Sequence, residues 1–402
     1  MGGGPVGMVA ALELIERGVS VTVLERRTEP RDSSRSIGIH PPALHLLDRL
    51  GCAEAVIAAG VRVQQGEVRS GGDVLGRLAF RSASPRHPYV LSVPQHVTER
   101  MLRARLAERA PGALVAGCEV TAAAPHDGGV RLTTTAGTID AGWVIGADGA
   151  RSAMRTLGGF TVRERAYPDR YVMGDAPDRS GLGDLAVLFL EAEGVVESFP
   201  LPGGRRRWVV HRGANPEPVD VDGLAQLVLR RTDVALDAAS IAGVSAFGVH
   251  HVWSTDTVRG RAVLLGDAAH EISPIGGQGM TLGWLDAAEL ATALPVVMGG
   301  GPSAALAAYA SRAARRQRMT ARQAYFNTVM GRPRRGGRLA VRNALVRTIA
   351  HPRLERRLAA SFTMAAPARI TAAAKAVAGS GGIAAADAAA SGDDRARYRG
   401  VT

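Results

Sequence analysis

The stretch Gly2-Gly3-Gly4-Pro5-Val6-Gly7 decides the fold that we expect for the first part of the chain. It places glycine at all three positions of a G-x-G-x-x-G turn, and a helical pattern follows from Met8 to Glu16. A β-branched run from Val19 to Leu24 then ends in Glu25, 18 residues after the last glycine. Glycine lets a backbone turn approach a pyrophosphate, and an acid at this spacing accepts hydrogen bonds from a ribose. The segment therefore predicts a dinucleotide-binding βαβ unit, and the alternative is a glycine-rich start without fixed structure.

The strand that should precede the glycine turn is missing from this pattern, because only Met1 stands before Gly2. In a unit of this type that strand is central, so its absence would leave the hydrogen-bonding edges of two neighbouring strands unpaired. The cost would be large against a typical stability of about 5–15 kcal/mol. We therefore expect a short apolar strand upstream of Met1 in the natural reading frame, and the alternative is that another segment fills the gap.

Composition limits the class of protein. The chain has 402 residues, of which 46% are hydrophobic and 21% charged, which is enough apolar material for two packed units. A disordered chain and a small disulfide scaffold are excluded. Two cysteines, Cys52 and Cys118, are too far apart for a redox pair or a zinc cluster, so we expect no metal site and a cytoplasmic location. No apolar run reaches the roughly 18 residues of a membrane span.

One segment supplies the net charge of +12. Between Arg312 and Ile370 there are fifteen arginines and a single acid, Glu355, so the rest of the chain is close to neutral. Aromatic side chains are scarce in this segment, which disfavours base stacking, and we expect no nucleic-acid partner. Two interpretations stay open for these basic helices: a solvated cap over the cofactor domain, or a weak peripheral contact with anionic lipid.

The remaining elements predict a chain that passes twice between two domains. Helices are expected over 41–50 and 97–110, and strands over 130–134, 138–140 and 143–145. Short alternating runs between 160 and 252 indicate a mostly antiparallel sheet. We expect the cofactor domain to comprise 1–72, 88–159 and 253–330, the sheet domain 73–87 and 160–252, basic helices 331–364, and a disordered tail 365–402.

Three separated motifs carry chemistry. They are the glycine turn, the segment Asp148-Gly149-Ala150-Arg151, and Gly266-Asp267 with the loop Pro274-Ile275-Gly276-Gly277-Gln278-Gly279 that follows it. Over roughly residues 1–330 the chain resembles the class A flavoprotein monooxygenases, the para-hydroxybenzoate hydroxylase-like family of FAD- and NAD(P)H-dependent aromatic hydroxylases. The resemblance implies an α/β fold. Its parts are a Rossmann-like FAD domain of the glutathione-reductase type, an inserted, mostly antiparallel substrate-binding sheet, and C-terminal helices.

The resemblance also implies roles for particular residues around FAD. The pyrophosphate would lie at Gly2, Gly4 and Gly7, where a helix N-terminus favours anionic oxygen. Glu25 would bind the adenosine ribose, Arg35 would lie near the flavin phosphate and ribityl chain, and Gln95 would lie beside the ribityl chain. Contacts with the FAD diphosphate and the nicotinamide cofactor would come from Asp148, Gly149 and Arg151. For Arg35 the alternative is a solvated loop charge, and for Gln95 a strand-to-helix connector.

The last motif would surround the flavin ring. Following Gly266, Asp267 would hydrogen-bond the ribityl O3′, and a carboxylate at a strand end is suited to accept such donors. The loop from Pro274 through Gly276, Gly277 and Gln278 to Gly279 would pass the isoalloxazine edge. The helix that starts near Gly279 and Met280 would then stabilise negative charge on the N1–C2=O locus of the reduced flavin. Thr281 departs from the family, which usually has asparagine there.

No catalytic base is singled out by the sequence. His270 follows the Asp-Ala-Ala run, where a packing or hydrogen-bonding role is favoured over catalysis. His211, His250 and His251 of the sheet domain are candidates no better than core or surface histidines.

The implied reaction is hydroxylation of an aromatic small molecule, phenolic or polyketide-like, with NAD(P)H and O2 through a flavin C4a-hydroperoxide. The alternative is a geranylgeranyl-reductase-like enzyme that reduces isoprenoid double bonds. A flavin-dependent halogenase is disfavoured, because the chain lacks that family's Trp-x-Trp-x-Ile-Pro motif and its lone lysine, Lys375, lies in the tail.

Overall fold

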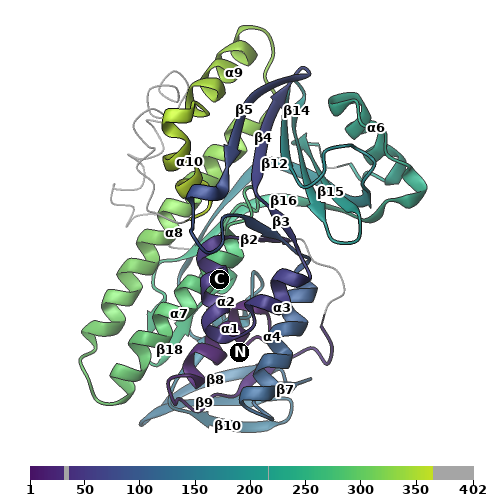
Figure 1. The fold of residues 1–402 in the computed structure, drawn as a ribbon. Helices are drawn as coiled ribbons and strands as arrows, with labels where there is room; N and C mark the ends of the chain where they lie inside the picture. The colour runs from purple at the N-terminus through teal and green to yellow at the C-terminus, as the bar shows by residue number, and fades with distance from the viewer. Residues whose placement is uncertain (31–35, 216, 365–402) are drawn as a thin grey trace, which may run out of the picture.

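The structure is a computed structural model that describes residues 1–30, 36–215 and 217–364. Its lower half in Figure 1 is built on short parallel strands. Strand β1 (Val23–Glu25) pairs with β7 (Leu114–Ala116), and β11 (Val144–Gly146) pairs with β18 (Ala262–Leu264), which also carries the antiparallel β17 (Val258–Arg259).

Apolar side chains cover these strands on both faces. Helices α1 (Pro5–Ile15) and α7 (Gly279–Met298) pack against each other on one face. On the other face lies an antiparallel meander whose strands are β8 (Val120–His126), β9 (Gly129–Thr134) and β10 (Gly137–Ala141). The first motif and the third therefore lie on adjacent elements of one layer.

A second group of helices completes the first core. Its members are α2 (Pro41–Leu50), α3 (Ala53–Ala58) and α4 (Gln95–Arg109), with a small sheet of β2 (Gly38–Ile39), β6 (Val90–Ser92) and β3 (Val61–Val63). Helix α2 ends as expected, because Gly51 takes the left-handed conformation with φ +73° that glycine tolerates best.

Met1 lies in the position where the sequence pattern lacks a strand. Its amino group donates to the Ile145 carbonyl at 2.8 Å, Ala147 N–H donates to the Met1 carbonyl, and Gly2 N–H donates to the Leu24 carbonyl. Beyond Met1 a cavity of about 330 Å³ separates residues 19–24 from residues 141–145. This gap explains why only Val23–Glu25 of the expected Val19–Leu24 strand region is paired.

The upper half of Figure 1 is one eight-stranded sheet, in the order β19-β16-β12-β15-β14-β13-β4-β5. Its strands are β4 (Gln65–Ser70), β5 (Asp73–Ala79), β12 (Val162–Pro177), β13 (Ala186–Glu191), β14 (Gly194–Leu201), β15 (Arg205–Gly213), β16 (Ala242–Ser254) and β19 (His270–Glu271). Every pairing is antiparallel except that of β13 with β4. Helix α6 (Val221–Thr232) covers one face.

The strand pairing moves the expected domain boundaries. Strand β4 was expected within 1–72 of the cofactor domain, but it hydrogen-bonds to β13 and β5 of the large sheet. The short strand β19, expected in the cofactor domain, pairs with β16. Both misplacements arise because these strands join the sheet through partners distant in sequence, which local patterns do not show.

The C-terminal helices pack mainly on the large sheet rather than on the cofactor domain. Helix α8 (Ala304–Gly331) begins beside α7 and reaches the sheet, whereas α9 (Gly337–Ile349) and α10 (Glu355–Phe362) contact β5 (Figure 1). Close approach requires Gly76 on β5, where an added Cβ would lie 2.2 Å from the Ala350 Cβ. The expected cap over the cofactor domain is therefore corrected for α9 and α10. Among the described residues no helix is long and apolar enough to cross a membrane.

Candidate cofactor and substrate site

The glycine turn has the geometry that its spacing predicts. Gly2 has φ +98°, and a Cβ added there would lie 2.4 Å from the Ala147 carbonyl oxygen. A Cβ at Gly7 would lie 1.9 Å from the Gly2 carbonyl oxygen. Both positions exclude a side chain, so the turn requires glycine for the close packing of α1 on the parallel strands.

Gly4 lies at the N-terminus of α1, and its surroundings differ from those of the other two glycines. A Cβ added at Gly4 meets nothing within 4 Å. Gly4 is the N-cap residue, no side chain caps the helix, and the first turn carries no acid. The first N–H groups of a helix lack intrahelical partners, so this open end is suited to bind an anionic group such as a pyrophosphate.

Glu25 lies beside the same turn, at the end of β1. It is buried, and its Oε2 accepts the Gly3 N–H at 2.7 Å while Oε1 accepts from Arg27 Nε at 2.9 Å. Burial alone would raise the pKa of Glu25, but the hydrogen bonds from Arg27 and Gly3 outweigh it and lower the pKa. An ionised acceptor therefore borders the glycine turn, as the motif predicts.

Asp148 forms hydrogen bonds within the protein at the start of a short helix. Asp148 accepts from Ser152 Oγ at 2.6 Å and from Met154 N–H at 3.0 Å, at the start of α5 (Ala153–Leu157). Gly149 has φ +80°, which positions the turn, and the Arg151 side chain is exposed. Because both carboxylate oxygens serve the helix start, Asp148 acts at least as a structural residue.

Arg155 joins the second motif to the third, and the sequence did not single it out. Its guanidinium donates to the carbonyl groups of Ala150, Asp267 and Ala268. Gly266 has φ +59°, and a Cβ there would lie 3.0 Å from the Val6 side chain, so the Asp267 turn packs closely on α1. The three motifs therefore converge on one place.

Asp267 faces the cavity described below without a hydrogen-bond partner for its carboxylate among the described residues. The side chain is exposed to the cavity, and desolvation by the surrounding protein, followed by the nearby Glu271 carboxylate, raises its pKa to about 6. An acceptor left open in this way fits a ligand that donates hydroxyl hydrogens, as a ribityl chain does.

The loop Pro274–Gly279 leads into α7 and forms one wall of the cavity. Gly276 and Gly277 have φ +100° and +65°, which non-glycine residues rarely adopt. Gln278 is the N-cap of α7 but makes no side-chain cap, so the first N–H groups near Gly279 and Met280 are open. These groups and the helix dipole can stabilise negative charge on a flat ring held there.

His40 was not predicted, and it lies behind this loop. Both ring nitrogens are buried without a hydrogen bond of normal geometry, and burial lowers the pKa of His40 to about 4. Its backbone N–H donates to Thr281 Oγ1 at 3.4 Å. The Gln278 Oε1 atom is likewise buried without a partner. Such orphaned polar atoms are typical of a place that a polar ligand completes.

Of the two remaining predicted residues, Gln95 and Arg35, the structure describes only Gln95. Gln95 begins α4 and lines the cavity, and its Nε2 donates to Glu99 at 2.7 Å. Arg35 lies outside the described residues.

Most of the histidines considered as catalytic bases form hydrogen bonds with other side chains of the protein. His270 is buried and bonds Asp286 at 2.8 Å, which supports its packing role. His211 is buried and bonds Asp169 at 3.0 Å. His251 bonds Gln317, whereas His250 lines the cavity but is half exposed.

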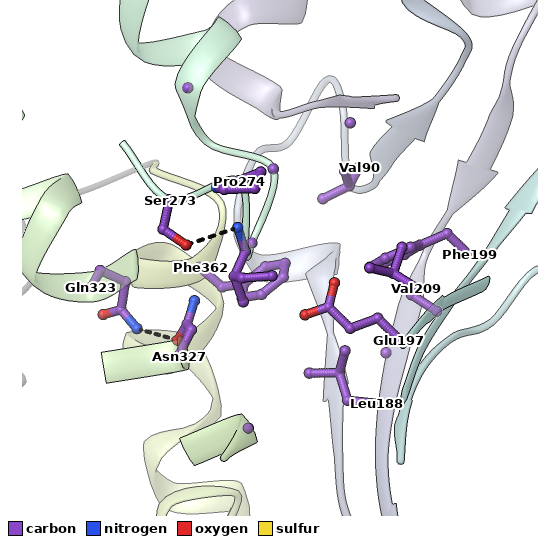
Figure 2. A pocket seen from close by; sticks show the side chains of 18 of the residues that line it. Val90, Leu188, Glu197, Phe199, Val209, Ser273, Pro274, Gln323, Asn327 and Phe362 are labelled. Carbon is purple, nitrogen blue, oxygen red and sulfur yellow. Dashed lines mark hydrogen bonds between the residues drawn. The ribbon is translucent and has the colours of Figure 1, made fainter. Parts of the chain in front are cut away.

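A single cavity of about 590 Å³ joins these features to the large sheet. Its cofactor end is bordered by Pro5, Val6, Asp267 and the Pro274–Gly279 loop. The other end is bordered by apolar side chains of the sheet and of the C-terminal helices, as Figure 2 shows for Leu188, Phe199, Val209 and Phe362. The lining is mostly apolar and of the size usual for a small-molecule site.

Phe362 of α10 is part of this wall, although its segment was predicted only as basic helices. Its ring stacks on Phe80 with centroids 5.6 Å apart, and its carbonyl accepts from Gln278 Nε2 at 2.9 Å. Ser361 bonds Gln323 of α8. The C-terminal helices thus close the cavity with apolar groups and carry their arginines elsewhere.

One cluster outside the cavity combines residue types that can bind a metal ion. His45, Asp48 and His87 offer ligand atoms within 4.8 Å of one another. The Arg86 guanidinium, however, lies 2.7 Å from the same Asp48 oxygen that faces His87. This positive charge already balances the carboxylate, so the cluster is an ion-pair network.

The residues present fit FAD. The α1 end at Pro5, the Asp267 carboxylate and the α7 end at Gly279 line one cavity, and the Glu25 acceptor lies beside the glycine turn that precedes α1. A family model described as the FAD binding domain matches residues 1–324. The chain therefore belongs to the FAD-binding domain family, and its relatives group it with the class A FAD-dependent aromatic hydroxylases.

Among relatives of known activity, an enzyme of Streptomyces rimosus named 12-dehydrotetracycline 5-monooxygenase/anhydrotetracycline 6-monooxygenase is 33% identical over 323 residues, covering 74% of this chain and 62% of the relative. Pentachlorophenol 4-monooxygenase of Sphingobium chlorophenolicum is 29% identical over 324 residues, with 75% and 58% covered. The chain spans less than two thirds of the length of these relatives.

The fold also matches a solved structure over nearly its whole length. The p-nitrophenol 4-monooxygenase PnpA of Pseudomonas putida DLL-E4 superimposes with a TM-score of 0.82 at 25% identity. The match covers 92% of this chain and 98% of that one. It confirms the mixed α/β fold with a large, mostly antiparallel sheet and C-terminal helices.

Proposed function

We propose that the chain is an FAD-dependent monooxygenase that uses NAD(P)H and O2 to hydroxylate an aromatic small molecule, phenolic or polyketide-like. The observation that carries the proposal is the single cavity that joins the cofactor features to an apolar wall on the large sheet. The oxygenase activity of the named relatives favours this function over reduction of isoprenoid double bonds.

In this proposal the chain positions and shields two reactants. The ends of α1 and α7 and the Asp267 carboxylate hold FAD, which supplies hydride acceptance and oxygen activation when bound. Phe80, Phe362 and the sheet side chains exclude water from the substrate end of the cavity. Exclusion of water keeps reactive oxygen from being lost before it reaches the ring.

The test is turnover by the purified chain reconstituted with FAD, supplied with NADH or NADPH in air and with a panel of phenols and polyketide aromatics. We expect one or more compounds to accelerate NAD(P)H oxidation and to gain one oxygen atom by mass spectrometry. The Asp267→Ala variant should lose this turnover, and the exposed-site variant Asp127→Asn should keep it. A saturated product formed without O2 would instead establish the reductase.

A further inference from the structure

On the large sheet, the carboxyl group of Glu197 faces the cavity. Glu197 lies in the middle of β14, and its cross-strand neighbours are Leu188 of β13 and Val209 of β15. Cross-strand partners share a face of the sheet, and all three residues line the cavity. Along the strand its same-face neighbours are Val195 and Phe199, so Glu197 interrupts an otherwise apolar row.

Glu197 is buried without compensation. It is 6% exposed and makes no hydrogen bond or ion pair with any described residue. Burial alone raises its pKa to about 7, with no neighbouring charge contributing. A buried polar group usually has a partner, and its absence here indicates that a ligand supplies one.

The other charged groups on the sheet wall of the cavity are paired, which makes Glu197 different from them. Glu67 accepts from Arg69 and Arg77 at 2.7 Å and 2.8 Å. Arg207 pairs with Asp175 at 2.7 Å. The remaining charged groups, Asp267 and Glu271, lie at the cofactor end, and His250 lies at the rim of the sheet. The substrate end of the cavity therefore presents one carboxylate without an ion-pair partner, and no unpaired cation, among the described residues.

The direction of the side chain matches this role. Figure 2 shows the Glu197 carboxylate pointing away from the sheet into the cavity, toward Phe362 and Asn327. Phe362 and Phe80 form a stacked apolar wall, and Phe199 lies beside Glu197 on the sheet. A flat aromatic ring fits between such walls, with its polar substituent at the carboxylate.

We propose that Glu197 recognises a hydroxyl group on the ring of the substrate, so that the site selects neutral phenol-type compounds and rejects aromatic carboxylates. The inference rests on the proposed function and names the substrate class of that site. A ring hydroxyl donates to the carboxylate, whereas a carboxylate substrate would place two acceptors of like charge together. The hydrogen bond also raises the electron density of the ring, which transfer of an electrophilic oxygen requires.

Binding of three matched ligands to the FAD-reconstituted protein tests the proposal without depending on turnover. The probes are β-naphthol, its methyl ether and β-naphthoate, and dissociation constants at pH 8 are read from the change in the visible spectrum of the bound flavin. The unaltered protein should bind the naphthol about tenfold more tightly than the ether, the size expected for a hydrogen bond to a charged group. β-Naphthoate should bind most weakly.

Two variants assign the preference to Glu197. Glu197→Leu should fold, because it removes an unpaired buried carboxyl, and its naphthol-to-ether ratio should fall to about one. Glu197→Gln should bind β-naphthoate more tightly than the unaltered protein does. The exposed-site variant Glu119→Gln is the matched control and should keep the original ratios.

An unchanged ratio in Glu197→Leu, or a ratio near one in the unaltered protein, would overturn the proposal. The result is separable from the proposed function. If the ratio depends on Glu197 but no compound is hydroxylated, the proposed function fails and the recognition role stands. If a compound is hydroxylated but the naphthol-to-ether ratio does not change when Glu197 is replaced, only the recognition role fails.

Discussion

Replacing Glu197 by glutamine should stabilise the protein in a pH-dependent way. Burial raises the pKa of Glu197 to about 7 from its ordinary value of 4.5. Between these values the folded protein retains a proton that the unfolded chain has lost, so the folded state becomes less stable as pH rises through this window. The difference corresponds to about 3 kcal/mol at pH 8 and under about 1 kcal/mol at pH 5. Glutamine stays neutral and avoids this cost.

Urea unfolding of the FAD-free protein at pH 5 and pH 8 measures the effect as the difference in free energy of unfolding between Glu197→Gln and the unaltered chain. We expect the variant to be more stable by about 3 kcal/mol at pH 8 and nearly equal at pH 5. Equal stability at pH 8, or the same gain at both pH values, would refute the argument from burial.

Glu67→Gln is the matched control, because Glu67 is also a buried glutamate on the cavity wall. Burial raises its pKa, but the hydrogen bonds from Arg77 and Arg69 outweigh that effect and lower it. A lowered pKa contributes stability above the ordinary value and loses it as pH falls, so Glu67→Gln should destabilise the protein at pH 8. The two variants should therefore differ in sign.

Three further predictions concern the cofactor end. Gly7→Ala should lower the melting temperature, because its Cβ would lie 1.9 Å from the Gly2 carbonyl oxygen. Gly4→Ala should keep the melting temperature and weaken FAD binding in a fluorescence titration, because a Cβ there meets no protein atom within 4 Å. Equal effects of the two variants would contradict the separate roles of Gly7 in packing and Gly4 in binding. Asp267→Asn should weaken FAD binding about tenfold or more in the same titration, and unchanged affinity would remove Asp267 from the site. A five-residue apolar extension before Met1 should raise the melting temperature by filling the gap beside residues 19–24, and a glycine-serine extension of equal length should not.

Local patterns were sufficient for the cofactor end. Gly51 predicted the end of α2. The glycine turn was recognised from the spacing of its glycines, and at Gly2 and Gly7 an added Cβ would collide with backbone atoms. The strand before Asp267 was recognised as a continuous apolar run, as buried parallel strands usually are. These features depend on residues close in sequence, and the structure has them where they were predicted.

The substrate end depends on pairing between distant segments, which no local pattern contains. Glu197 looks like any polar residue in an alternating strand until the register places it between Leu188 and Val209. Phe362 contacts Phe80 across most of the length of the chain. Asp148 was predicted as a cofactor contact, and the sequence did not show that the start of α5 uses both of its carboxylate oxygens.

The measurement that tests the account most directly is the visible absorption spectrum of the purified chain with FAD, followed during addition of NADPH and then NADH in air with a phenol present. The account predicts a protein-bound flavin band at about 450 nm. The band should bleach on reduction and return with O2, with one oxygen atom gained by the phenol. A chain that is folded by circular dichroism yet binds no flavin would contradict the assignment of the cavity.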